Sequence, residues 1–167
     1  MLEILEASPE QPVQRLRPDI LPALAPVRTI ALSVAVDADA RRISQALMEP
    51  EYLEAWISMP DQTEDSSIVI SKKPTGYGLD HWRAGRVVTS IVGSFLFCHR
   101  RKMRLSWRDI AAPGMTESFV DFRIRGNFAS SVLELRHTAL RSAGEFLWYE
   151  QLWSVSLARL AAILRSA

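Results

Sequence analysis

The 167-residue chain has little cysteine and no surplus of charge of either sign. Its single cysteine, Cys98, excludes an internal disulfide framework and any metal site built from several cysteines. The 20 Lys and Arg residues against 19 Asp and Glu give a net charge of +1. So small a charge provides no general attraction to nucleic acid or to an anionic membrane, and neither partner is expected.

Long apolar runs are also missing, because no stretch approaches the roughly 20 residues that a membrane-spanning helix needs. The first residues, MLEILEASPEQ, have neither the basic start nor the apolar centre of a secretory signal. A lone thiol is compatible with a reducing compartment. We therefore expect a cytoplasmic protein.

Common sequence motifs of catalytic, nucleotide-binding and metal-binding sites are absent as well. The sequence contains no G-x-S-x-G, P-loop, G-x-G-x-x-G or H-E-x-x-H motif. Its three histidines, His81, His99 and His137, do not have the spacing of metal ligands. The sequence therefore predicts no catalytic residue, no metal and no cofactor.

Proline is concentrated at one end of the chain. Residues 1–28 hold five of the nine prolines. Proline fixes φ and has no amide donor, so a regular helix or strand cannot run through this segment. It is either a disordered extension or an ordered strap held by apolar side chains such as Leu16 and Ile20. Residues 29–167 are expected to form one domain.

The first elements of that domain have clear signals. Residues 29–36 alternate in hydrophobicity, which predicts a strand. Asp37 follows as the expected N-cap of a helix over residues 38–47. Pro50 is placed to begin a second short helix, PEYLEAW.

Residues 66–139 are typical of a series of strands. The predicted strands are SSIVISKK, LDHWR, RVVTSIVGSFLFC, MRLSWRD, FVDFRIR and SVLELRHTA. Alternation puts Met103, Leu105 and Trp107 on one face, and Gly93 indicates a bulge or bend in the longest strand. Because the connections are short, the strands should form an antiparallel meander.

Residues 143–165 carry the strongest helical pattern. Phe146, Tyr149, Trp153 and Leu157 form one stripe at spacings of three and four. The full order predicts an α+β helix-grip fold, in which a curved antiparallel sheet of about six to seven strands wraps around this helix. A concave apolar space between sheet and helix is the default ligand site.

Three stretches resemble a known superfamily when taken together and in order. They are SVAVDADARRISQALMEPEYLEAWI, LELRHTAL, and Trp153-x-x-x-Leu157-x-x-Leu160. They are similar to the START-like superfamily, also described as Bet v 1-like or SRPBCC. The branch they resemble is named for the C-terminal domain of Hsp90 ATPase activators. The resemblance covers residues 29–165, and it implies that Trp153 faces the sheet.

Eight residues are candidates for the wall of a ligand site: Trp56, Trp82, Trp107, Phe122, His137, Tyr149, Trp153 and Leu157. Core packing explains each tryptophan equally well, although a buried indole N–H still needs a partner. His137 shares its predicted face with Leu133 and Leu135. It is either a core histidine with satisfied nitrogens or a polar group that orients a ligand.

Three functions follow as hypotheses. The first is binding of a small apolar ligand, lipid-like or aromatic, between helix and sheet. If side chains fill that gap completely, this hypothesis loses its basis. The second is a protein-interaction module, with a protein partner or a homodimer, as the co-chaperone resemblance implies. Its surface would include Arg100, Arg101 and Arg104.

The third hypothesis is an enzyme of the cyclase or aromatase type, as some helix-grip relatives are. It would need polar groups that converge in the pocket. Asp80, His137 and Tyr149 are the available candidates.

Overall fold

The computed structural model describes residues 27–112, 117–126 and 129–166, and these residues form seven strands and three helices. The strands are β1 (Arg28–Val36), β2 (Ser66–Lys73), β3 (Gly76–Arg83), β4 (Arg86–His99), β5 (Lys102–Asp109), β6 (Ser118–Gly126) and β7 (Ser131–Leu140). The helices are α1 (Ala40–Met48), α2 (Pro50–Trp56) and α3 (Ala143–Ser166).

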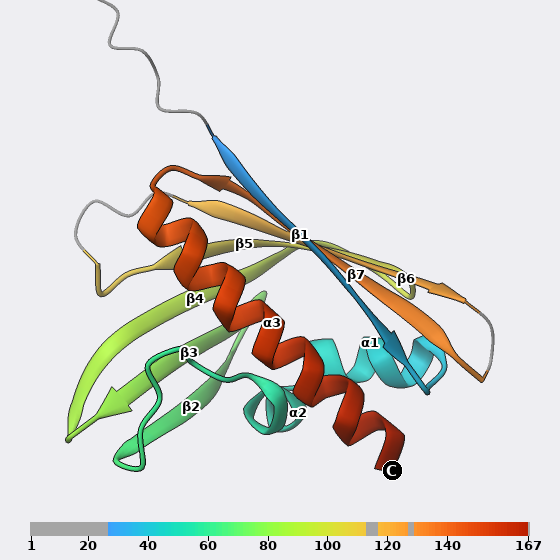
Figure 1. Ribbon diagram of the computed structural model, residues 1–167, viewed down its shortest axis with the longest axis horizontal. Helices are drawn as coiled ribbons and strands as arrows, with labels where there is room; N and C mark the ends of the chain where they lie inside the picture. Colours follow the sequence, from blue (N-terminus) through green and yellow to red (C-terminus); the bar gives the residue numbers. More distant parts are fainter. Residues whose placement is uncertain (1–26, 113–116, 127–128, 167) are drawn as a thin grey trace, which may run out of the picture.

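All seven strands belong to one antiparallel sheet in the order β1-β7-β6-β5-β4-β3-β2. Strands β2 to β7 form a meander, and β1 closes the sheet beside β7. Figure 1 shows the twisted sheet with α3 running across its concave side. The predicted α+β helix-grip fold is confirmed.

Alternation along the strands decides which side chains meet the helices. On β5, Met103, Leu105 and Trp107 are buried while Lys102 and Arg104 are exposed. We call the buried side the inner face and the other side the outer face. The predicted apolar faces of β5, β6 and β7 are therefore all correct, because one side of each strand packs under the helices.

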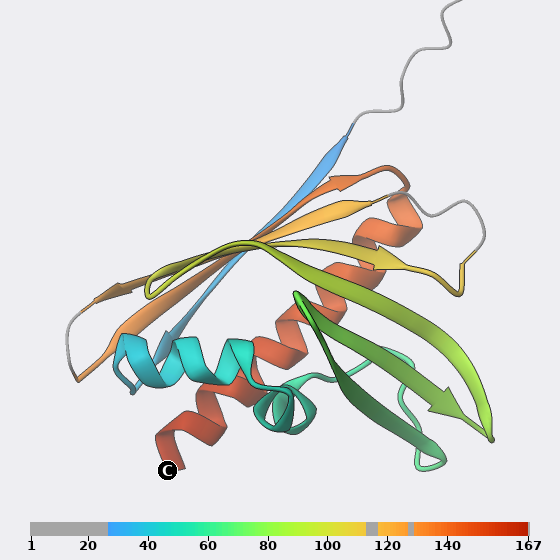
Figure 2. The same cartoon turned by 180° about the vertical axis from the view of Figure 1, so that it is seen from behind.

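The long helix packs through the stripe that its sequence predicts. Tyr149, Trp153, Leu157, Leu160 and Leu164 are all buried. Among the strands, α3 lies nearest to β1, and its C-terminal half approaches α2 (Figure 2). Side chains, rather than close backbone contact, therefore fill the space between α3 and the middle of the sheet.

The start of α1 differs from the prediction. The N-cap is Asp39, whose carboxylate accepts the Arg42 amide N–H at 2.8 Å. Asp37 was expected in this role, but the helix begins only at Ala40, beyond the reach of an Asp37 cap. Asp37 instead pairs with Arg165 at 3.0 Å, near the end of α3.

The irregularity in β4 also lies elsewhere than predicted. One bulge falls between Phe95 and Phe97 in the pairing with β5, and a second falls between Val87 and Thr89 in the pairing with β3. Gly93 stays in register opposite Trp107. A Cβ atom at Gly93 would lie 3.2 Å from the Tyr77 ring and 3.4 Å from the Trp107 ring. This glycine therefore makes room for two buried rings rather than for a bend.

Most of the predicted proline-rich extension, residues 1–28, lies outside the described residues, and β1 begins at Arg28. Among the residues that the structure describes, no helix is long and apolar enough to cross a membrane.

Candidate functional site

Five of the eight predicted wall residues meet on the inner face. The Trp153 ring lies 5.2 Å from Trp107 and 5.9 Å from Phe122, measured between centroids. The His137 ring lies 4.5 Å from that of Tyr149. These side chains pack against one another, so the centre of the gap between α3 and the sheet is occupied by protein. We call Trp107, Phe122, His137, Tyr149 and Trp153 the central cluster.

His137 is the polar member of this cluster, and it is 0% exposed. Its Nδ1 accepts the indole N–H of Trp153 at 3.0 Å. Because an indole nitrogen can only donate, the proton of the neutral ring sits on Nε2, which lies 2.7 Å from the Ser118 hydroxyl oxygen. The Ser118 hydroxyl in turn donates to the Trp107 carbonyl at 2.9 Å.

This chain of three hydrogen bonds uses both nitrogens of His137. Burial also lowers the pKa of His137 to about 3, so the ring is neutral at physiological pH. His137 thus has neither a free lone pair nor a free proton to offer a ligand. Of the two roles open to it from the sequence, the geometry matches the satisfied core histidine.

Trp56 and Leu157 are buried outside the central cluster. Trp56 lies on α2, and its indole N–H donates to the Ala46 carbonyl of α1 at 2.9 Å. This bond holds the two short helices together. Leu157 belongs to the buried stripe of α3.

Trp82 does not join the other candidates. It lies on the outer face with 37% of its surface exposed, opposite the exposed Val87. Asp80 lies on the same face and accepts the Ser90 hydroxyl at 2.5 Å. On β3 it is His81 that faces inward. Asp80 therefore does not converge with His137 and Tyr149 as the enzyme hypothesis requires.

A hollow of about 280 Å³ remains beside the central cluster, between the first turns of α3 and strands β4 and β5. We call it the α3 hollow. Its lining residues are Thr89, Asp109, Ser142, Gly144, Glu145, Trp148 and Tyr149. Two aromatic rings, from Trp148 and Tyr149, stand 5.0 Å apart on its helical side. Hydroxyl and carboxylate groups supply the remainder, so the hollow is amphipathic.

Local structure explains the two carboxylates of the α3 hollow. Asp109 Oδ1 accepts the Ala111 amide at 2.9 Å, which shapes the turn after β5. Glu145 Oε2 accepts the Arg141 amide at 2.8 Å, while the Ser142 hydroxyl accepts the Glu145 amide at 3.0 Å. The second pair is a reciprocal cap at the start of α3. Burial, and secondarily the charge of Asp109, raises the pKa of Tyr149.

Of the residues that line the α3 hollow, only Tyr149 was predicted from the sequence, and Thr89, Asp109, Glu145 and Trp148 were missed. The signal for Asp109 was present, since it continues the alternation of Met103, Leu105 and Trp107 onto the inner face. Its charge obscured that signal, because a carboxylate at an inner position is unusual.

A second buried histidine lies near the α3 hollow. His81 is 0% exposed and sits opposite Thr89 in the β3–β4 register. Neither of its ring nitrogens has a hydrogen-bond partner among the described residues, and the nearest carboxylate oxygen, on Asp61, is 3.7 Å away. Burial lowers the pKa of His81. Unlike His137, His81 thus has open hydrogen-bonding capacity.

A larger groove of about 980 Å³ runs over the surface between α1 and the β2–β3 turn. Lys72, Lys73, Glu49 and Glu51 are among its lining residues, so charged groups of both signs face solvent there. The α3 hollow matches the predicted site better, because it lies between helix and sheet and shares Tyr149 with the central cluster.

No family model matches this sequence, and no curated protein matches it. Several solved structures do match the fold of this chain. Protein CV1439 from Chromobacterium violaceum is 18% identical with a TM-score of 0.68, and the match covers 81% of this chain and 96% of that one. CalU16 from Micromonospora echinospora is 21% identical with a TM-score of 0.59, over 83% of this chain and 75% of that one.

The Aha1 dimer from Colwellia psychrerythraea is 17% identical with a TM-score of 0.57, over 82% of this chain and 96% of that one. At these identities the likeness shows a shared fold alone. The chain has the helix-grip fold of these proteins. The co-chaperone branch rests on the sequence resemblance only.

Proposed function

We propose that this protein binds a small, largely apolar molecule in the α3 hollow. The observation that carries the proposal is an amphipathic hollow of about 280 Å³ between helix and sheet, with Trp148 and Tyr149 on one side. Ligand sites in proteins are commonly concave and aromatic with a few polar groups, and they start at about 300 Å³. A volume at this lower limit favours a compact aromatic or short aliphatic ligand over a full lipid.

The polar groups of the hollow would orient such a ligand. Thr89 and Tyr149 supply hydroxyl groups that can donate or accept, and Asp109 supplies an acceptor. A ligand with one hydroxyl or amine on an apolar body would satisfy both kinds of surface. The proposal is restricted to binding, because both nitrogens of His137 are engaged and Asp80 lies on the outer face.

Gly144 allows a sharp test of the proposal. A Cβ atom at this position would meet nothing within 4 Å, so Gly144→Phe should fill the hollow without disturbing the fold. Gln151→Phe adds the same ring to the exposed side of α3 as a control. We would titrate each protein with 1-anilinonaphthalene-8-sulfonate and follow the fluorescence of the dye. Binding should weaken at least about tenfold in Gly144→Phe alone.

Native mass spectrometry of the protein as isolated from cells complements this titration. A small molecule that is retained by the native protein, lost on denaturation and missing from Gly144→Phe would give the chemical class of the natural ligand. Equal dye binding by the wild type, Gly144→Phe and Gln151→Phe would contradict the proposed site.

A further inference from the structure

The outer face of the sheet carries a groove of about 750 Å³ that the proposed ligand site does not involve. We call it the outer groove. Its charged lining consists of five cations, Lys102, Arg104, Arg123, Arg125 and Arg136, and two carboxylates, Asp121 and Glu134. The whole chain has a net charge of only +1, so positive charge is concentrated here.

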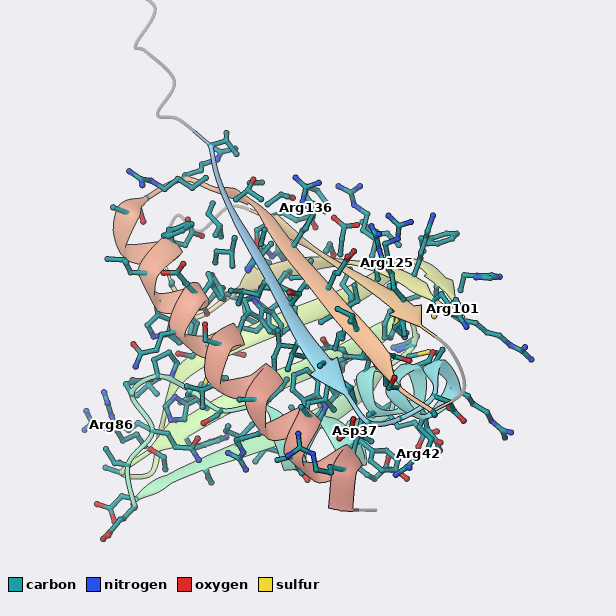
Figure 3. All side chains as sticks on the ribbon, turned by 45° about the vertical axis from the view of Figure 1, so that its right-hand side comes forward. Asp37, Arg42, Arg86, Arg101, Arg125 and Arg136 are labelled. Carbon is teal, nitrogen blue, oxygen red and sulfur yellow. The ribbon has the colours of Figure 1, made fainter. Side chains whose placement is uncertain are left out.

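The strand register arranges these groups in two rows across the sheet. The first row runs Phe97, Arg104, Asp121 and Arg136 over β4 to β7, and the second runs Lys102, Arg123 and Glu134 over β5 to β7. Figure 3 shows Arg125 and Arg136 on the same side of the molecule, with Arg86 at the opposite end. Neighbouring strands are about 4.8 Å apart, so the longer row spans roughly 14 Å.

Lys102 and Arg123 face each other directly across β5 and β6. Like charges in opposite positions of an antiparallel pair destabilise the sheet. This like-charge pair therefore does not stabilise the folded domain, and a negatively charged partner would relieve its repulsion.

The carboxylates of the groove are already paired. Arg104 lies 3.7 Å from Asp121, and Arg125 lies 2.9 Å from Glu134. Lys102, Arg123 and Arg136 form no ion pair within the part of the chain that the structure describes. Three cations are therefore free to meet charges from outside the domain.

We infer that the outer groove binds an acidic segment of a partner protein. Arginine side chains bind carboxylates through two parallel hydrogen bonds, and two of the three unpaired cations are arginines. Phe97, which is 52% exposed at the β4 end of the first row, offers an apolar contact beside them. The fitting segment thus combines carboxylates with an apolar side chain.

Nucleic acid fits the outer groove less well. Its phosphates carry an uninterrupted negative charge, which would run against Asp121 and Glu134 between the arginines. A protein segment can place its carboxylates opposite the free cations only.

The test is a binding titration with a fluorescein-labelled peptide of repeating Glu-Glu-Phe units, followed by fluorescence anisotropy at low ionic strength. The double variant Arg123→Glu/Arg136→Glu should weaken binding at least about tenfold. Arg86→Glu makes the same kind of charge change at the exposed start of β4 and should change the affinity less than about twofold.

The variant Lys102→Glu distinguishes between two interpretations of the outer groove, a binding surface and an ordinary solvated face. It replaces the like-charge pair with Arg123 by an opposite-charge pair, so the midpoint of thermal unfolding should rise while peptide binding weakens. Wild-type protein that does not bind the peptide would overturn the inference. So would equal binding by the double variant, or tighter binding of an oligo-deoxythymidine of matched length.

Discussion

Trp153 of α3 donates its indole N–H to Nδ1 of His137 on β7 at 3.0 Å, and this bond ties the long helix to the centre of the sheet. Both residues are fully buried, so water cannot replace either partner. The bond also fixes the tautomer of His137 and thereby directs its Nε2 proton to Ser118. One contact therefore sets the hydrogen bonding of three residues.

Replacing His137 by leucine should destabilise the domain. The substitution leaves the Trp153 indole N–H without an acceptor in the core, and an unsatisfied buried donor costs about 1–3 kcal/mol. We expect the free energy of unfolding in urea to fall by about 3 kcal/mol once the changed packing is included. Trp153→Phe in the same background should cost less than it does in the wild type, because its partner is already gone. Fully additive effects would show that the bond does not couple the two residues.

Stability should also depend on pH through His137. Its pKa is about 3 in the folded protein against 6.5 for the free side chain, so between these values only the unfolded chain takes up the proton. Stability is therefore complete above about pH 6.5 and falls as the pH is lowered, by about 1.4 kcal/mol per pH unit. Urea unfolding at a series of pH values measures this slope. It should be shallower in His137→Leu, and identical slopes in the two proteins would refute the assignment.

His81 should respond to the same substitution in the opposite way. Its two ring nitrogens have no hydrogen-bond partner among the described residues, so His81→Leu removes buried polar groups that gain little from their surroundings. We expect the free energy of unfolding at neutral pH to stay constant or to rise by about 1 kcal/mol. A loss comparable to that of His137→Leu would mean that a water molecule or Asp61 satisfies the ring.

Gly93 should tolerate no side chain. An added methyl group would press on the rings of Tyr77 and Trp107, which are held at 5.9 Å from each other in the core. We expect Gly93→Ala to lower the free energy of unfolding by about 1–3 kcal/mol. Gly144→Ala serves as the control, because its methyl group meets open space and alanine favours a helix. A neutral Gly93→Ala would show that the two rings can move apart.

Much of the fold was predictable because local signals agreed with one another. Alternation on β5, β6 and β7 and the stripe of Tyr149, Trp153 and Leu157 describe one buried face from both sides. The same signals could not decide which face of a strand turns inward when both faces carry polar and apolar groups. On β3 the large apolar Trp82 is outside and His81 is inside, because pairing with β4 sets the face of the whole strand.

The candidate site was predictable only in part. The residues of the central cluster do lie in the gap between α3 and the sheet, whereas Trp82 lies on the outer face. Whether aromatic side chains line a space or fill it depends on side-chain packing across several elements. Asp109 and Glu145 were overlooked because each has a local task, in a turn and in a helix cap, and such residues carry no separate signal for a pocket. Volume left over after packing is a property of the assembled domain.

The bulge between Phe95 and Phe97 shifts the alternation of side chains between the two faces of β4. Leu96 is the additional residue, and it turns Phe97 toward Arg104 on the outer face while Cys98 falls opposite Met103 on the inner face. If the same sequence paired without this bulge, Leu96 would lie opposite Arg104 on the outer face and Phe97 opposite Met103 on the inner face. The bulge thus determines both which aromatic side chain the end of this hairpin presents to the outside and which small side chain it turns toward Met103.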